Sequence, residues 1–237
     1  MQISHSNNPF LHATISNLLT KEENDILYEM CEKACEPYSE SIDDLSFFIL
    51  PQDRHLLDKH GISYCRRSGI VNNNVGVPLG SSNNAIYQNI QSRIYDRLSQ
   101  PEFTNIFPIL HSEHNGNPLK WGAGLCITSD YTTHQLLPHT DNPDELIEYG
   151  KKNNIQVSCG RYKGVIFITK DGLDYSHYGT RFYKTNSRSS EFLEEPYIGG
   201  NACMFKTGPD SWHGTHFKKG LPNRRYTITI EYYWNKK

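Results

Sequence analysis

The stretch RYTITIEYYW (225–234), near the end of the chain, decides the fold class because its side chains alternate in character. Counting by two, Tyr226 and Ile228 share one face of an extended strand, whereas Arg225 and Thr227 share the other. The first face is apolar and aromatic, so it predicts packing against helices or an opposing sheet. The second face is polar, and polar groups that point into a β-structure need partners.

Five further strand-like runs precede this stretch, and turn clusters such as Lys170-Asp171-Gly172 separate them. These runs are GLCITSDY (124–131), HQLLPHTD (134–141), GVIFITK (164–170), TRFYK (180–184) and NACMFKT (201–207). Many short strands with regular turn signals are typical of a sandwich or a barrel. The second half of the chain is therefore predicted to be mainly β.

The first half carries helical signals instead. Thr20 and Glu23 form a capping box, and the apolar spacing that follows predicts a helix over 21–36. Isoleucines four residues apart predict a second helix over 84–99. The turn-rich segment between these helices holds short strand-like runs at 45–50 and 68–72.

These patterns predict an α+β, mainly β, protein whose N-terminal helices pack on one sheet. No linker demands a boundary, so we expect residues 1–237 to form one domain. Its first part, 1–120, is expected to be helical and irregular, and its second part, 121–237, to be the β core.

Composition excludes several classes of protein. The formal charge of -2 gives no overall basic field for nucleic acid, and no apolar run is long enough to cross a bilayer. The six cysteines form no C-x-x-C pair, and no secretion signal is visible. We therefore expect free thiols in a reducing, cytoplasmic environment.

His139 and Asp141 are two residues apart on an extended run, so their side chains point to the same side. His213 follows 74 residues after His139 and can complete a clamp of two imidazoles and one carboxylate. That set, with its other positions open, is the one expected for a non-haem Fe(II) oxygenase. His216 is the other candidate for this third ligand position. Residues three apart in a strand face opposite sides, so only one of His213 and His216 can reach the metal.

Arg225 offers a second recognition point. An arginine fork matches a carboxylate with two hydrogen bonds, and the hydroxyl of Thr227 can donate another. Arg224 is the rival for this position and is expected to turn outwards. The alternative is that Arg225 is a surface residue at the start of its strand.

Together, HTDNP (139–143), WHG (212–214) and RYTITIEYY (225–233) resemble the 2-oxoglutarate/Fe(II)-dependent dioxygenases, specifically the prolyl-4-hydroxylase-like branch. The resemblance covers about residues 124–234. It implies a double-stranded β-helix (jelly-roll) core. It implies Fe(II) held by His139, Asp141 and His213, and it assigns the distal carboxylate of 2-oxoglutarate to Arg225 and Thr227. Tyr131 is a further candidate for binding this co-substrate.

The resemblance also implies a reaction, in which 2-oxoglutarate and O2 give succinate and CO2 while a C–H bond of the substrate is hydroxylated. Ascorbate is a candidate reductant. The substrate, whether a small molecule or a peptide, and the oligomeric state are not legible, and neither a nucleic-acid partner nor a membrane is expected. Two alternatives stay open: a cupin-like divalent-metal binding or isomerase module, and a catalytically silent oxygenase fold that binds proteins.

Two segments are candidates for shaping the substrate site. The stretch 142–163 interrupts the strands with a charged insertion. Tyr175, His177 and Tyr178 occupy a short loop after GVIFITK and are lid candidates. Alternatively, these three are exposed turn residues without a role.

Overall fold

The computed structural model describes residues 1–35, 70–74, 85–108, 119–122, 124–128, 138–153, 160–215 and 225–233. Within these ranges, most of the secondary structure is β, and the strands pair antiparallel in two sheets. Few helices accompany them. The predicted mainly β character is therefore confirmed.

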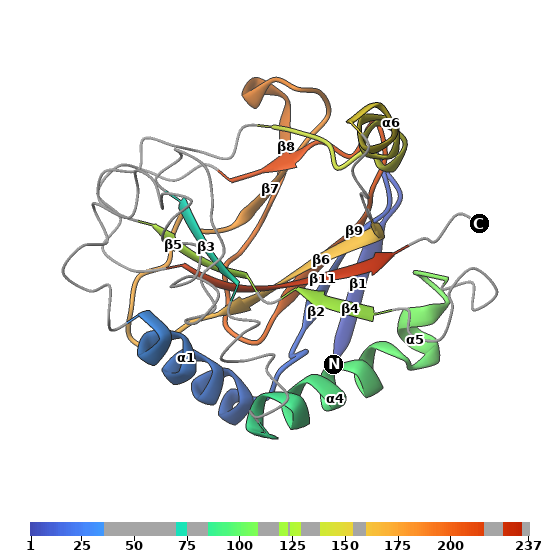
Figure 1. Cartoon of the computed structure of the whole chain (residues 1–237). Helices are drawn as coiled ribbons and strands as arrows, with labels where there is room; N and C mark the ends of the chain where they lie inside the picture. Colours follow the sequence, from blue (N-terminus) through green and yellow to red (C-terminus); the bar gives the residue numbers. More distant parts are fainter. Residues whose placement is uncertain are drawn as a thin grey trace.

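The large sheet has eight strands and runs through the middle of the molecule (Figure 1). Its order is β1 (Gln2–Ser6), β2 (His12–Ser16), β9 (Ala202–Lys206), β6 (Gly160–Ile168), β11 (Tyr226–Tyr233), β5 (Gly124–Thr128) and β3 (Ile70–Asn74), with β4 (Leu119–Gly122) also paired to β11. The small sheet has the order β10 (His213–Gly214), β7 (Thr180–Tyr183) and β8 (Glu191–Glu195).

The helices lie outside the two sheets. They are α1 (Lys21–Cys35), α4 (Ala85–Leu98), the single turn α5 (Pro101–Thr104) and α6 (Pro143–Asn153), together with the 3-10 turn η4 (Arg188–Ser190). Figure 1 shows α1 and α4 on one side of the large sheet and β7 and β8 on the other. The large sheet is thus covered on both faces.

Each face of the large sheet has its own buried core, because side chains alternate along the strands. The helix-side core combines Tyr226 and Ile228 of β11 with helix residues such as Leu27 and Ile94. The inter-sheet core lies on the opposite face and consists of Phe10, Phe167, Tyr178, Phe182, Tyr197, Cys203 and Phe205. The strand stretch that begins at Arg225 therefore buries its apolar face against helices, and its polar face looks toward the small sheet.

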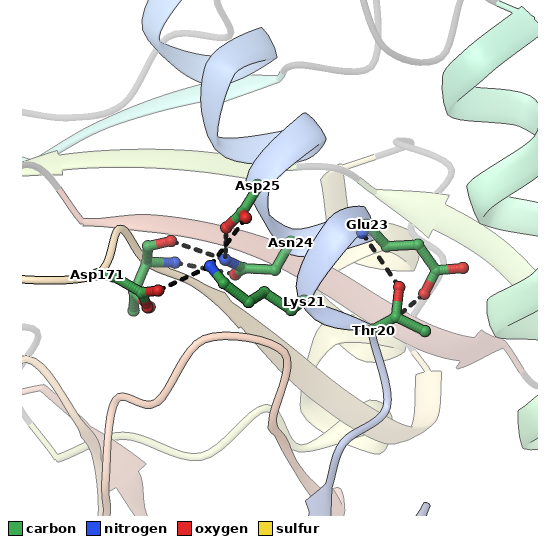
Figure 2. Close-up of polar contacts among 7 residues, drawn as sticks. Thr20, Lys21, Glu23, Asn24, Asp25 and Asp171 are labelled. Atoms are coloured by element: carbon green, nitrogen blue, oxygen red, sulfur yellow. Dashed lines mark hydrogen bonds and ion pairs between the residues drawn. The ribbon is translucent and has the colours of Figure 1, made fainter.

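Helix α1 begins with the predicted capping box (Figure 2). The backbone N–H of Glu23 donates to Thr20 Oγ1 at 3.2 Å, and the N–H of Thr20 donates to Glu23 Oε2 at 2.8 Å. Two N–H groups that would otherwise lack helical partners are thereby satisfied. Arg97 of α4 grips the same Glu23 carboxylate through both terminal nitrogens, at 2.7 and 3.0 Å. The capping box consequently also joins the two helices.

The first turn of α1 is fastened to the end of β6. The Asn24 amide donates to the carbonyl of Thr169 at 2.8 Å, and its oxygen accepts from the Thr169 N–H at 3.1 Å. Lys21 bridges Asp25 and Asp171 at 2.9 and 2.7 Å (Figure 2). Exposed ion pairs of this kind contribute little to stability, so the buried Asn24 contacts are the stronger tie.

Most of the predicted elements are confirmed within the described residues. The helix expected over 21–36 is α1, the helix expected over 84–99 is α4, and the strand expected at 68–72 is β3. The runs starting at 124, 164, 180, 201 and 225 correspond to β5, β6, β7, β9 and β11. The run at 45–50 and most of 134–141 lie outside the described residues.

Three features correct the expectations. Strands β1 and β2 join the large sheet through β9, although the sequence analysis predicted no strand at the N-terminus. The stretch treated as an insertion, 142–163, contains the helix α6, which begins at Pro143. Strand β6 begins at Gly160, four residues before the predicted start, so Lys163 belongs to the sheet.

Cys203 is the one cysteine whose side chain the structure describes, and it is free and buried. Burial raises the pKa of its thiol to about 12, so the reactive thiolate is disfavoured. In the part of the chain that is described, no helix combines the length and the apolar character needed to span a bilayer.

Glu195 is a buried carboxyl group that joins the two sheets. It ends β8 with 3% of its surface exposed, and Thr14 Oγ1 of β2 lies 2.7 Å from each of its oxygens. Burial raises the pKa of this carboxyl group, and the hydrogen bond from Thr14 opposes the shift only in part. Folding therefore shifts the equilibrium of Glu195 toward its protonated form.

This shift predicts a pH-dependent effect of Glu195→Gln on stability. Because the pKa is raised on folding, the stabilising contribution of Glu195 is complete below the unfolded pKa and is lost as pH rises through the folded value. The variant should therefore gain stability relative to wild type as pH rises above about 4, the ordinary pKa of a glutamate. Urea unfolding at a series of pH values measures the difference, with exposed Glu148→Gln as the control. A difference that does not change with pH would contradict the assignment.

Candidate metal centre

Two histidines far apart in the sequence are joined by their backbones. The N–H of His139 donates to the carbonyl of His213 at 3.0 Å, and the N–H of His213 donates to the carbonyl of His139 at 2.9 Å. This is the hydrogen-bonded pair of an antiparallel ladder, in which opposite side chains lie on the same side. The ring centroids are 4.3 Å apart. His139 thus extends the small sheet beyond β10.

Asp141 lies between this bridge and the start of α6. Asn142 caps that helix, since its side-chain oxygen accepts from the N–H of Asp144 at 3.3 Å and its amide donates to Glu145 at 2.9 Å. Pro143 is the first residue of α6, where its missing N–H does no harm. The position of Asp141 is therefore fixed by the His139–His213 bridge on one side and by the start of α6 on the other.

The three predicted ligands meet at this point. His139, Asp141 and His213 each offer one ligand atom, and these atoms all lie within 4.8 Å of one another. Asp141 Oδ2 is 3.2 Å from His213 Nε2, and Asp141 Oδ1 is 3.9 Å from His139 Nε2. Neighbouring ligands around an ion with bonds of about 2.1 Å lie about 3 Å apart in an octahedron. The group therefore fits one transition-metal ion.

The orientation of His213 favours a metal ligand. Its Nδ1 lies 2.9 Å from the carbonyl oxygen of Ser211, an acceptor, so Nδ1 carries the proton. Its other ring nitrogen, Nε2, faces the Asp141 carboxylate. A cation between these atoms satisfies both, and a carbonyl behind a histidine ligand is the usual arrangement at metal sites. His213 is 5% exposed and lies against Phe205, so this ligand is shielded from water.

The Asp141 carboxylate is held in its charged form. Burial alone would raise its pKa, but the hydrogen bond with His213 and the positive charge of Lys163 outweigh burial and hold the pKa far below its usual range. Lys163 Nζ lies 2.7 Å from Asp141 Oδ2. An ionised carboxylate is the form that binds a metal ion.

The structure places Arg225 and Thr227 on the inner face of β11, where both are buried. The Nε of Arg225 donates to the carbonyl of Tyr178 at 2.8 Å, and one terminal nitrogen lies 3.4 Å from Thr180 Oγ1. The guanidinium also lies over the ring of Tyr197, 5.3 Å from its centroid. These contacts fix the direction of the side chain and exclude the surface alternative.

Arg225 and His213 border the same buried cluster. Tyr178 and Tyr197, which contact Arg225, belong to the inter-sheet core together with Phe205. Phe205 in turn contacts His213, with ring centroids 4.4 Å apart. The guanidinium of Arg225 and the His213 ligand therefore face one apolar region between the two sheets, where electrostatic interactions are strong.

Some predicted residues fall elsewhere. Tyr131, His216 and Arg224 lie outside the described residues. Tyr178 is fully buried and contributes its carbonyl to Arg225, so it supports the arginine and is no lid. Tyr175 packs edge-on against Tyr178, and its hydroxyl accepts from a backbone N–H at 3.1 Å.

Sequence reasoning missed Lys163, Thr180 and Tyr197. Lys163 was left in the insertion, although it continues the alternation with Val165 and Phe167 on the inner face of β6. Extending that alternation back by two residues would have found it. Thr180 and Tyr197 carry no such signal, because their roles depend on how β7 and β8 meet β11.

A cavity of about 790 Å³ opens at the other end of β6, beside the first turn of α1. Its walls include Asn24, Asp171, Tyr175 and Tyr197 but none of the three candidate ligands. Tyr197 separates this cavity from the guanidinium of Arg225. We assign the chemistry to the histidine and aspartate cluster, because that is where ligand atoms converge.

Comparison with solved structures identifies the fold. The chain is similar to a prolyl hydroxylase in complex with a hypoxia inducible factor oxygen degradation domain peptide fragment from Trichoplax adhaerens, with a TM-score of 0.55 and 13% identity over 94% of this chain and 83% of that chain. It is also similar to a Pseudomonas putida prolyl-4-hydroxylase, with a TM-score of 0.51 and 10% identity over 95% of this chain and 92% of that chain. No protein-family model and no curated protein matches the sequence.

The fold is therefore like that of the prolyl hydroxylases. The class predicted from the HTDNP, WHG and RYTITIEYY segments is confirmed at the level of the fold. At 10% to 13% identity, the likeness concerns the fold and leaves activity to be argued from the site.

The cluster predicts that Asp141→Ala abolishes tight binding of a divalent metal. The variant loses the only anionic ligand of the three. Its affinity for the metal should therefore fall further than it does when a residue that merely contacts a ligand is removed, which typically costs about 10- to 100-fold. Calorimetric titration of Co(II) into the metal-free protein measures this. Asp174→Ala, in an exposed loop, is the matched control and should bind like wild type. Equal binding by Asp141→Ala and wild type would rule out the cluster as the metal centre.

Proposed function

We propose that this protein is an Fe(II)- and 2-oxoglutarate-dependent dioxygenase that hydroxylates a C–H bond and releases succinate and CO2. The observation that carries this proposal is the convergence of His139, Asp141 and His213 within 4.8 Å on a prolyl hydroxylase-like fold. Two imidazoles and one carboxylate with open positions suit Fe(II). Arg225 supplies the cation that an acidic co-substrate needs.

The strand order supports a double-stranded β-helix for the core. From β5 to β11, the chain passes back and forth between the large sheet (β5, β6, β9 and β11) and the small sheet (His139, β7, β8 and β10), with β7 and β8 as one antiparallel pair within the small sheet. This alternation is what winding a jelly roll requires. The helices α1 and α4 then back the large sheet on its outer face.

Different residues would bind the metal ion and the co-substrate. His139, Asp141 and His213 would hold Fe(II), which when bound supplies the redox chemistry with O2 and a Lewis-acid site for the keto acid. The guanidinium of Arg225 would bind the distal carboxylate of 2-oxoglutarate, with the hydroxyl of Thr227 as a second donor. Tyr131 is proposed as a further contact to this co-substrate.

The inter-sheet core contributes by excluding water. Phe205 packs against His213 and Phe182 packs against Phe205, and both phenylalanines are fully buried. A dry environment strengthens the interaction between a guanidinium and a carboxylate. It also protects reactive species from side reactions. Ascorbate is proposed as the reductant that keeps the iron in its divalent state.

The substrate class follows only by analogy. Both similar structures are prolyl hydroxylases, and one contains a peptide of a hypoxia inducible factor. A peptide that contains proline is therefore the first substrate we propose to test. Free amino acids and other small molecules form the comparison set.

The proposal predicts turnover without a substrate. Purified protein with Fe(II), ascorbate, O2 and 2-oxoglutarate should release succinate slowly, and 2-oxoglutarate should raise the melting temperature of the metal-loaded protein. His139→Ala should lose both effects because it removes a ligand. Chromatography of succinate and thermal unfolding measure them. Metal binding without any response to 2-oxoglutarate would instead favour the cupin-like alternative.

The role of Arg225 predicts a selective loss in Arg225→Lys. Lysine keeps the charge but not the two parallel hydrogen bonds, a difference of about 1.5–3 kcal/mol or about 10- to 100-fold in the KM for 2-oxoglutarate. Binding of the metal alone should not change. Arg188→Lys, exposed in η4, is the control. A KM within about twofold of wild type would refute the anchor.

A further inference from the structure

Lys163 is the charged residue at the metal centre that neither the motif nor the proposed reaction accounts for. It lies in β6, between β9 and β11 in the large sheet. In the sheet register it stands opposite Phe205 of β9 and Glu231 of β11. Its Nζ lies 2.7 Å from Asp141 Oδ2. About a quarter of its side chain is exposed, at 24%.

The backbone of Lys163 is much better fixed than that of Asp141. Paired strands hold β6 on both sides, so the Cα of Lys163 cannot shift without disturbing the sheet. Asp141, in contrast, lies between the single bridge at His139 and the start of α6, outside any strand. The last torsion of an aspartate is broad, so its carboxylate turns unless a partner holds it. Lys163 is such a partner.

The contact also has the strength to hold the carboxylate. A hydrogen bond between an ammonium group and a carboxylate is shorter and roughly twice as strong as a neutral one. Both groups are partly buried, with exposed side-chain fractions of 24% for Lys163 and 21% for Asp141. Screening by water is thereby reduced compared with a surface pair.

We propose that Lys163 is a positioning residue of the metal centre, whose ammonium group holds Oδ2 of Asp141 so that the carboxylate offers the metal ion one oxygen instead of two. This inference rests on the proposed function. An octahedral ion with three protein ligands keeps three positions, which two atoms of 2-oxoglutarate and O2 would fill. A carboxylate that chelates with both oxygens would occupy one of them.

The inference can be tested by binding Co(II) to the metal-free protein, without turnover. Lys163→Met removes the charge and keeps the length of the side chain, whereas Lys163→Arg keeps a cation. We expect Lys163→Met to lower the affinity for Co(II) about 10- to 100-fold and to change the visible absorption spectrum of the bound ion. Lys163→Arg should restore most of the affinity. Lys206→Met, exposed on neighbouring β9, is the matched control and should bind like wild type.

Thermal unfolding separates positioning from a merely structural role. The melting temperature without metal reports folding, and the increase caused by a fixed concentration of Co(II) reports binding. Lys163→Met should reduce that increase while its metal-free melting temperature stays near that of wild type. If the Met variant does not fold, Lys163→Ala takes its place, with the same expected loss.

Three outcomes would overturn the inference. Wild-type affinity and an unchanged Co(II) spectrum in Lys163→Met would show that Lys163 does not orient Asp141. An equal loss in Lys163→Arg and Lys163→Met would show that the cation is not what holds the carboxylate. If the wild-type protein itself binds no Co(II), the cluster is not a metal centre and the proposed function fails as well. The first two outcomes, in contrast, refute only the role of Lys163.

Discussion

The two reciprocal backbone hydrogen bonds between His139 and His213 are the constraint on which the site depends. They join segments that are far apart in the chain, and the geometry of a hydrogen-bonded antiparallel pair places both imidazoles on one side. Asp141 follows two residues later, where α6 is about to begin. Without this pair, no backbone hydrogen bond among the described residues would hold the segment of His213 beside the segment of His139 and Asp141. With it, the ligand atoms of the three candidate residues lie within 4.8 Å of one another.

The two faces of the large sheet have different functions: one packs against helices, and the other carries polar residues of the candidate site. One face packs against α1, α4 and α5 and forms the helix-side core. The other face carries Lys163, Arg225 and Thr227 toward the small sheet. A single strand such as β11 serves both tasks because its side chains alternate. Charged groups can therefore be held rigidly inside the protein while apolar residues on the reverse side of the same strands stabilise it.

The sequence predicted the elements whose signal is local. The capping box at Thr20 located the start of α1, and alternation along 225–234 located β11 and both of its faces. The three candidate ligands and the arginine were singled out because their residue types suit a known chemistry, and the structure brings the three candidate ligand atoms within 4.8 Å of one another. Burial of Arg225 then decided between an internal and a surface position.

Features that depend on tertiary contacts escaped prediction. Strand β1 is mostly exposed and largely polar, so its apolar alternation is weak, and its pairing with β2 is visible only in three dimensions. Helix α6 was overlooked because Asn142 and Pro143 signal the end of a strand as well as the start of a helix. Lys163 was overlooked because the predicted strand started one residue too late to include it. The contact with Asp141 connects residues that no local pattern links.

The most direct measurement of the central claim is a crystal structure with Mn(II) and 2-oxoglutarate, using anomalous diffraction to locate the metal. We expect one strong peak about 2.0–2.3 Å from His139 Nε2, His213 Nε2 and a single oxygen of Asp141, with the distal carboxylate of 2-oxoglutarate on Arg225. A peak bound by other residues would contradict it, as would a co-substrate that turns its carboxylate away from Arg225.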